Sequence, residues 1–81
     1  MKVRVQFFSH LKEIMGEAAL ELDLPNKTTV ADLLAQLYER TPALRDWDQS
    51  ILIGAGVEFV GRDQILQPDE DIAIMPPVQG G

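Results

Sequence analysis

Residues 2–8 read Lys-Val-Arg-Val-Gln-Phe-Phe, with apolar side chains at every second position from Val3 to Phe7. Successive side chains of a β-strand point to opposite faces, so this alternation predicts a strand that presents Val3, Val5 and Phe7 to a core. A second alternating run, residues 20–24, follows after a short connection and ends before Pro25. The two runs predict an antiparallel pair of strands at the beginning of the fold.

Helical signals flank the second strand. Ser9 is a candidate cap for a short helical stretch that Gly16 would end, because glycine readily adopts the left-handed conformation at helix ends. Thr29 and Asp32 have the spacing of a capping box and predict the start of the main helix, which Pro42 prevents from continuing. The apolar face expected for this helix consists of Val30, Leu33, Leu34, Leu37 and Tyr38.

The remaining chain predicts short strands near residues 51–53, 57–60 and 71–75, separated by turns rich in glycine, proline and aspartate. The order of strand, strand, helix and further short strands indicates an α+β fold. A β-grasp arrangement fits this order, with a small mixed sheet and one main helix packed on one of its faces. We expect a β-grasp domain over residues 1–75 and an extended, flexible tail over residues 76–81.

Length and composition exclude several kinds of function. Eighty-one residues correspond to one small domain, and a net charge of −6 disfavours nucleic acids and anionic membranes as partners. The chain has no cysteine, so thiolate catalysis and cysteine-ligated metal sites are excluded. No apolar run approaches the roughly 20 residues that cross a bilayer. With no basic leader before the first strand, we expect a cytoplasmic protein.

The residues that commonly carry catalysis are sparse. His10 is the single histidine, and a surface or capping position is the simpler interpretation than a catalytic dyad. Asp69, Glu70 and Asp71 could attract a divalent cation, although adjacent acids in a turn are more often a solvated surface. Gly54 and Gly56 are not followed by a third glycine that opens a helix, as in a phosphate-binding loop. We therefore expect neither a metal site nor a bound cofactor.

Phe8 and Met75 break the alternation of their strands, since each has the parity opposite to the core residues beside it. If the first and last strands are neighbours, both side chains share the outer face of the sheet and form a partner surface. The alternatives are that a loop covers them or that the strand register differs by one residue.

The end of the chain is the most informative segment. Prolines favour an extended exit from the last strand, and six extended residues reach roughly 18–20 Å. Such a tail could enter a narrow tunnel of another protein and deliver an unhindered glycine carboxylate, whereas a frayed end is the simpler alternative. An ATP-dependent enzyme could activate this carboxylate as an acyl-adenylate for attack by sulfur or an amine. The six residues are Pro76, Pro77, Val78, Gln79, Gly80 and Gly81.

Over nearly its whole length, the chain resembles the small subunits of molybdopterin synthase, which are β-grasp sulfur carriers related in fold to ubiquitin. The strongest parts of the resemblance are the final six residues and Phe7-Phe8 followed by Lys12-Glu13 and Gly16. Two turns depart from the family pattern, at Ala55-Gly56 and at Asp69-Glu70-Asp71, and Met75 replaces a common aromatic residue.

The resemblance implies a non-catalytic carrier with its chemistry at Gly81. An E1-like adenylyltransferase would activate Gly81 with ATP and magnesium, and a sulfurtransferase system would convert the adenylate to a thiocarboxylate. The large synthase subunit would hold the tail, recognise residues 76–80 and supply the catalytic groups. Two carrier turnovers would convert cyclic pyranopterin monophosphate to the molybdopterin dithiolene, typically in a heterotetramer. Phe8 and Met75 would contact the large subunit.

Three alternatives stay open at this point. The carrier could serve another pathway, such as thiamine, cysteine or thiolated tRNA synthesis. It could be a ubiquitin-like modifier joined through Gly81 to lysines of other proteins. It could also be a β-grasp binding module whose tail has no chemical role, because a fold alone does not fix a function.

Overall fold

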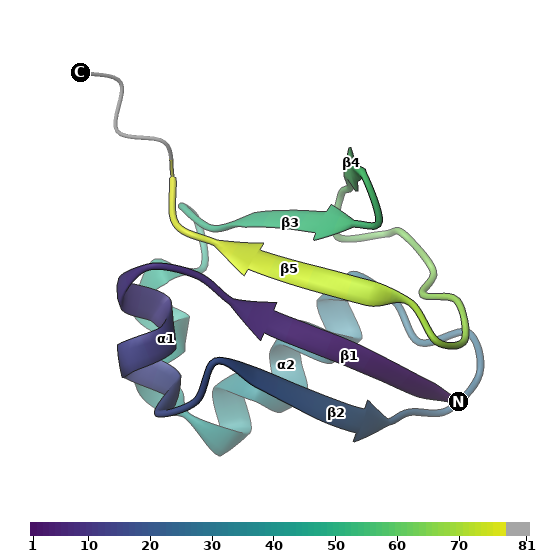
Figure 1. Ribbon diagram of the computed structural model, residues 1–81, viewed down its shortest axis with the longest axis horizontal. Helices are drawn as coiled ribbons and strands as arrows, with labels where there is room; N and C mark the ends of the chain where they lie inside the picture. The colour runs from purple at the N-terminus through teal and green to yellow at the C-terminus, as the bar shows by residue number, and fades with distance from the viewer. Residues whose placement is uncertain (78–81) are drawn as a thin grey trace.

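The structure is a computed structural model that describes residues 1–77. Within these residues, five strands form one mixed sheet in the order β2-β1-β5-β3-β4, and α1 lies at one end of it (Figure 1). The α+β fold and the β-grasp arrangement are thereby confirmed. The elements in chain order are β1 (Lys2–Phe7), α1 (His10–Met15), β2 (Ala19–Asp23), α2 (Val30–Arg40), the 3-10 helix η1 (Pro42–Trp47), β3 (Leu52–Ala55), β4 (Glu58–Phe59) and β5 (Asp71–Met75).

The first and last strands lie side by side at the centre of the sheet. β1 pairs with β2 in antiparallel orientation, as predicted, and with β5 in parallel orientation. Phe7 lies opposite Ile74 across the parallel pair, and both are buried. β3 then pairs with β5 in antiparallel orientation, with Leu52 opposite Met75. The register of β5 is therefore fixed on both sides, and each of its side chains has a defined face.

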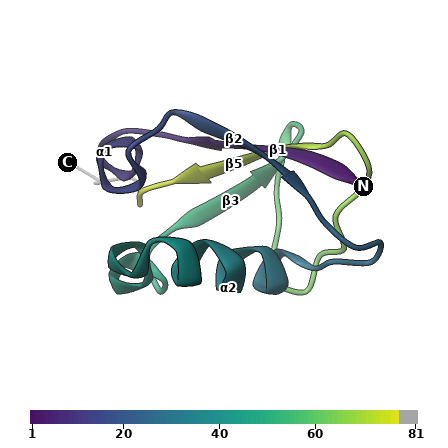
Figure 2. The same ribbon diagram turned by 90° about the horizontal axis from the view of Figure 1, so that it is seen from below.

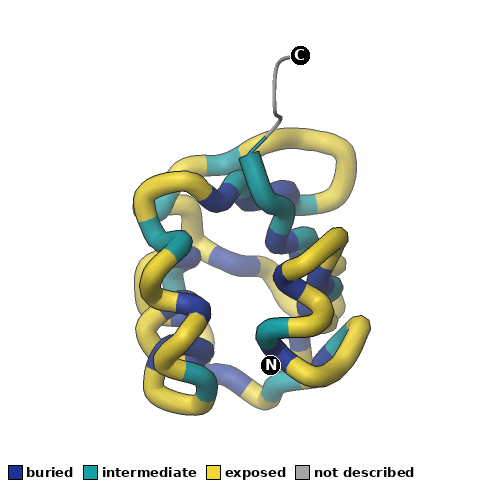
Figure 3. Tube along the Cα trace, turned by 90° about the vertical axis from the view of Figure 1, so that its left-hand side faces the viewer, coloured by how far each residue is buried: buried dark blue, intermediate teal, exposed yellow. Residues whose placement is uncertain are grey.

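Helix α2 covers one face of the sheet (Figure 2). The Thr29 hydroxyl accepts a hydrogen bond from the Asp32 amide at 3.2 Å, and the Asp32 carboxylate accepts one from the Thr29 amide at 3.3 Å. This confirms the predicted capping box. All five residues of the predicted apolar face are buried against the sheet. Along the chain trace, buried and exposed residues alternate with the periods of the helices and strands (Figure 3).

Three local predictions need correction. Ser9 precedes α1 with a φ of 56°, and its side chain makes no capping hydrogen bond. The second strand ends at Asp23, before the predicted Leu24. The strand predicted over residues 57–60 is shorter, since only Glu58 and Phe59 pair with β3, beside a turn with Gly56 at φ 63°. Gly16 ends α1 in the left-handed conformation, as predicted.

A polar cluster connects α2, the end of η1 and the loop after β4. The Tyr38 hydroxyl donates to the Asp48 carboxylate, and Arg62 donates to the same carboxylate oxygen at 2.8 Å. Burial raises the pKa of the Tyr38 hydroxyl to about 12, and the hydrogen bond to Asp48 acts in the same direction. The hydrogen bonds from Tyr38 and Arg62 lower the pKa of the Asp48 carboxyl. The Arg45 guanidinium lies 5.7 Å from the centre of the Tyr38 ring.

The pKa of Tyr38 predicts a specific alkaline loss of stability. Below pH 10 the hydroxyl is protonated in both states, whereas between pH 10 and about 12 the unfolded chain releases the proton that the folded chain retains. The free energy of unfolding should therefore fall in this range, and Tyr38→Phe should remove that part of the fall. Tyr38 is the only tyrosine, so an ultraviolet titration of tyrosinate measures its pKa directly. A midpoint near 10 in the folded protein would contradict the expectation.

Candidate functional site

The face of the sheet opposite α2 carries a row of residues across four strands, of which the first is polar and the other three are small or apolar. Gln6 of β1 lies opposite Ala73 of β5, which lies opposite Gly54 of β3, which lies opposite Phe59 of β4. Directly paired residues point to the same face of a sheet. The adjoining row pairs Leu52 with Met75. These rows form the floor of a surface on the side away from the helix.

Phe8 continues this surface beyond the end of β1. Its backbone amide donates to the Ile74 carbonyl at 3.1 Å, so it follows β1 alongside β5. Its side chain is 43% exposed, whereas the preceding Phe7 is buried. Phe8 and Met75 therefore lie on neighbouring strand ends with the outward parity that the sequence predicted. The alternative of a register shifted by one residue is excluded, because Phe7 and Ile74 are paired and buried.

We call this surface the apolar outer face. Four large apolar side chains among residues 1–77 are exposed, and Phe8 and Phe59 of this face are two of them, with Phe59 71% exposed. Phe59 was missed by the sequence analysis, although the parity of residues 57–60 could have suggested it. Gly54 and Ala73 could not have been found without the strand register. The residues of the apolar outer face are Phe8, Leu52, Gly54, Phe59, Ala73 and Met75.

Gly54 determines how Met75 lies on this face. A Cβ atom added at Gly54 would lie 3.3 Å from the Met75 terminal methyl carbon and 3.6 Å from the Ala73 Cβ. The Met75 side chain therefore lies across β3, in the space that the side chain of any residue other than glycine at position 54 would need. This close approach makes the middle of the apolar outer face continuous between β5 and β3.

Charged residues occupy the other end of the same outer face. Arg4 of β1 lies between Glu21 of β2 and Asp71 of β5, and Lys2 lies opposite Asp23. Opposite charges at directly paired positions stabilise a sheet modestly. This end is polar, with two basic and three acidic side chains, whereas Phe8 and Met75 lie at the end where β5 finishes.

The tail begins at that apolar end. Pro76 and Pro77 follow Met75 directly, are partly exposed and belong to no strand. The sequence-predicted residues Val78, Gln79, Gly80 and Gly81 lie outside the described residues. Phe8, Met75, Pro76 and Pro77 thus lie at one end of the fold, which is the end where β5 finishes (Figure 1).

His10 and the acidic turn before β5, which the sequence analysis considered for catalysis and metal binding, both make contacts within the fold. The His10 ring packs on Trp47 with their centres 4.4 Å apart. In the turn before β5, Asp69 adopts a φ of 62° and the Glu70 carboxylate accepts the Gln67 amide at 3.0 Å. In the part of the chain that is described, no group of three or more potential metal-ligating side chains gathers. No helix of that part is long and apolar enough to cross a membrane.

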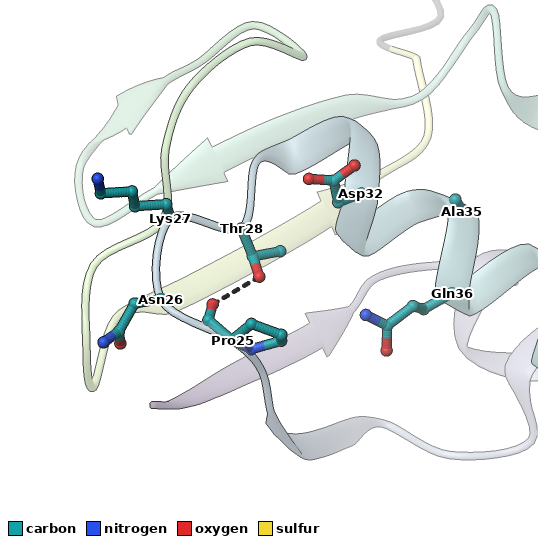
Figure 4. A pocket seen from close by; sticks show the side chains of 7 residues that line it. All are labelled: Pro25, Asn26, Lys27, Thr28, Asp32, Ala35 and Gln36. Carbon is teal, nitrogen blue, oxygen red and sulfur yellow. Dashed lines mark hydrogen bonds between the residues drawn. The ribbon is translucent and has the colours of Figure 1, made fainter.

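A surface hollow of about 410 Å³ lies beside the start of α2. Its wall includes the loop in which the Thr28 hydroxyl donates to the Pro25 carbonyl at 2.6 Å (Figure 4). The side chains of Asn26 and Lys27 extend away from Asp32 (Figure 4). These polar groups do not converge on a common point, so the hollow offers little that would orient a ligand.

Comparisons with known proteins agree with this geometry. A curated molybdopterin synthase sulfur carrier subunit from Homo sapiens is 31% identical over 83 residues, which cover 99% of this chain and 94% of the relative. The solution structure of small archaeal modifier protein 1 from Methanosarcina acetivorans has a TM-score of 0.81 and 28% identity, covering 99% of this chain and 96% of that chain.

A third similar structure is a protein–protein complex of subunits 1 and 2 of the molybdopterin-converting factor from Helicobacter pylori. Its matching chain has a TM-score of 0.71 and 22% identity, with complete coverage of both chains, and so supports the fold alone. The ThiS family matches residues 5–81. The resemblance found in the sequence is thereby confirmed, and the chain belongs to the ThiS family.

Proposed function

We propose that this chain is the sulfur carrier subunit of a molybdopterin synthase and that it carries sulfur as a thiocarboxylate at Gly81. The observation that supports this proposal best is that the apolar outer face extends to the end of the sheet where β5 leads into Pro76 and Pro77. A partner that covers this face would receive the tail beside it. The human relative, similar over nearly its whole length, supports the choice of pathway.

The proposed chemistry begins with activation of the carboxylate. A carboxylate is a poor electrophile, because its charge is delocalised and oxide is a poor leaving group. An E1-like adenylyltransferase would join the Gly81 carboxylate to the AMP part of ATP, with magnesium in that enzyme, and release pyrophosphate. A sulfur nucleophile from a sulfurtransferase system would then attack the acyl carbon and displace AMP. The product after release of the sulfur donor is the thiocarboxylate.

The proposed roles of this chain are docking and delivery. Phe8 and Met75 would contact the large synthase subunit, while Pro76, Pro77 and residues 78–80 would be recognised in its active site. Glycines without side chains suit a narrow channel. The large subunit would supply the catalytic groups that transfer sulfur to cyclic pyranopterin monophosphate. Subunit 1 of the Helicobacter pylori factor, which shares this fold, was solved in a complex with subunit 2, and this supports a large-subunit partner.

The first experiment tests the chemistry at Gly81. The protein should be incubated with the activating enzyme of a molybdopterin pathway, ATP, magnesium and a sulfur donor, and its intact mass measured. We expect a gain equal to the replacement of one oxygen by one sulfur. Deletion of Gly81 should abolish the gain. An unchanged mass, with the activating enzyme shown to work on its own carrier, would contradict the carrier proposal.

The second experiment tests the apolar outer face. Phe8→Ser and Phe59→Ser should each weaken binding to a molybdopterin synthase large subunit by at least about tenfold, because exposed aromatic residues at the centre of an interface contribute much of its affinity. Ile65→Ser is the matched control. The exposed fraction of Ile65, 45%, is similar to that of Phe8, but Ile65 lies outside this face, in a β-bridge with Thr29. Equal losses from all three variants, measured by calorimetry, would argue against a specific docking face.

A second candidate function is protein modification, which the similarity to small archaeal modifier protein 1 favours. A lysine amine of a target protein would attack the same adenylate and form an isopeptide bond at Gly81. Conjugates that resist both reductant and hydroxylamine would support this function. Their absence from cells, together with a thiocarboxylate on the free protein, would leave sulfur transfer as the supported role. Transfer to another sulfur pathway would appear as a thiocarboxylate without affinity for the large subunit.

A further inference from the structure

The three methionines of the chain differ in what they pack against, since Met15 belongs to the core, Met1 packs on it and Met75 does neither. Met15 belongs to the core and is 8% exposed, and the Met1 side chain is 3% exposed. Met75 is partly exposed on the apolar outer face. Because the Met1 and Met15 side chains pack on the core and Met75 lies on the sheet surface, we expect a dissolved oxidant to reach the Met75 thioether first. The chain also has no cysteine that could compete for the oxidant.

We propose that Met75 is a site of reversible oxidation to the sulfoxide and that its oxidation switches off docking through the apolar outer face. The oxidant is a peroxide. The sulfur lone pair attacks one peroxide oxygen, an S–O bond forms and the O–O bond breaks, and the leaving hydroxide takes up a proton to become water. Sulfur loses two electrons and the peroxide gains them. This inference concerns the docking surface of the proposed function and rests on it.

The position of Met75 explains why one oxygen atom matters. The side chain lies over Gly54 and beside Ala73, with its terminal methyl carbon where a Gly54 Cβ atom would have a close contact. These neighbours offer no polar side chain, and the backbones of β3 and β5 are paired with each other there. A sulfoxide oxygen at this place keeps its hydrogen bonds to water only while the face is exposed. A partner that covers the face would leave the oxygen without them, which is costly.

The unoxidised Met75 thioether is also well suited to docking. Methionine is flexible and polarizable, and it adapts to irregular apolar surfaces. The sulfoxide is polar and chiral, and both of its epimers are returned to the thioether by reductases specific for each. The reaction that restores docking consumes a dithiol reductant and releases the added oxygen as water.

The test combines peptide mapping with binding. The purified chain should be treated with limiting hydrogen peroxide and analysed by peptide mass mapping, where we expect Met75 to be oxidised well before Met1 and Met15. Affinity for a molybdopterin synthase large subunit should then fall by at least about tenfold, equivalent to about 1.4 kcal/mol. Treatment with both classes of methionine sulfoxide reductase and a dithiol should restore it.

Matched variants separate oxidation of Met75 from general damage. Met75→Leu conserves the volume of the side chain but removes the sulfur, so its affinity, whatever its value before treatment, should not change with peroxide. Met15→Leu should bind and stay sensitive. Equal oxidation of all three methionines, unchanged affinity of the Met75 sulfoxide, or loss of binding by peroxide-treated Met75→Leu would each overturn the inference. Failure of the untreated protein to bind would instead contradict the proposed function and, with it, the docking consequence.

Discussion

The parallel pairing of β1 with β5 is the interaction on which the rest of the structure depends. It joins residues near the two ends of the described chain, so the intervening helices and strands have to pack around this central pair. Val5 lies opposite Ile72, and Phe7 opposite Ile74; all four are buried at the centre of the sheet. Parallel strands require a long connection, which here includes β2, α2 and β3. Because these four side chains are buried, the residues that alternate with them on β1 and β5 point to the opposite face of the sheet.

This parity gives the sheet two faces with different tasks. The inner face packs on α2 and supplies the core, whereas the outer face has a charged end and an apolar part. A single domain of this size has little surface to divide between stability and recognition. Because Phe8 and Met75 immediately follow the buried residues Phe7 and Ile74, the same register that forms the core places the proposed docking residues at the exit of the tail. Stability and docking thus use alternate residues of the same strands.

Much of this arrangement could be predicted from the sequence. The alternation of residues 2–8, the capping box at Thr29 and the helical spacing in α2 are local signals, and they were interpreted correctly. Ser9 was misjudged because its positive φ is imposed by the turn from β1 into α1, which no local pattern reveals. The apolar outer face was predicted only at Phe8 and Met75. Gly54, Ala73 and Phe59 join it through strand pairings between distant segments, and the sequence does not display such registers. The roles proposed for residues 78–81 rest on their sequence and family, since these residues lie outside the described ones.

The most direct measurement of the central claim is an amide chemical-shift map of the labelled chain during titration with a molybdopterin synthase large subunit. The account predicts that the perturbed amides gather at Phe8, along β3 and β4, and at the end of β5 through the residues that follow Met75. The exposed side of α2 and the loop at Asn26 should be unaffected. Perturbations centred on α2, with the outer face of the sheet unchanged, would contradict the claim that this face docks the partner and delivers the tail.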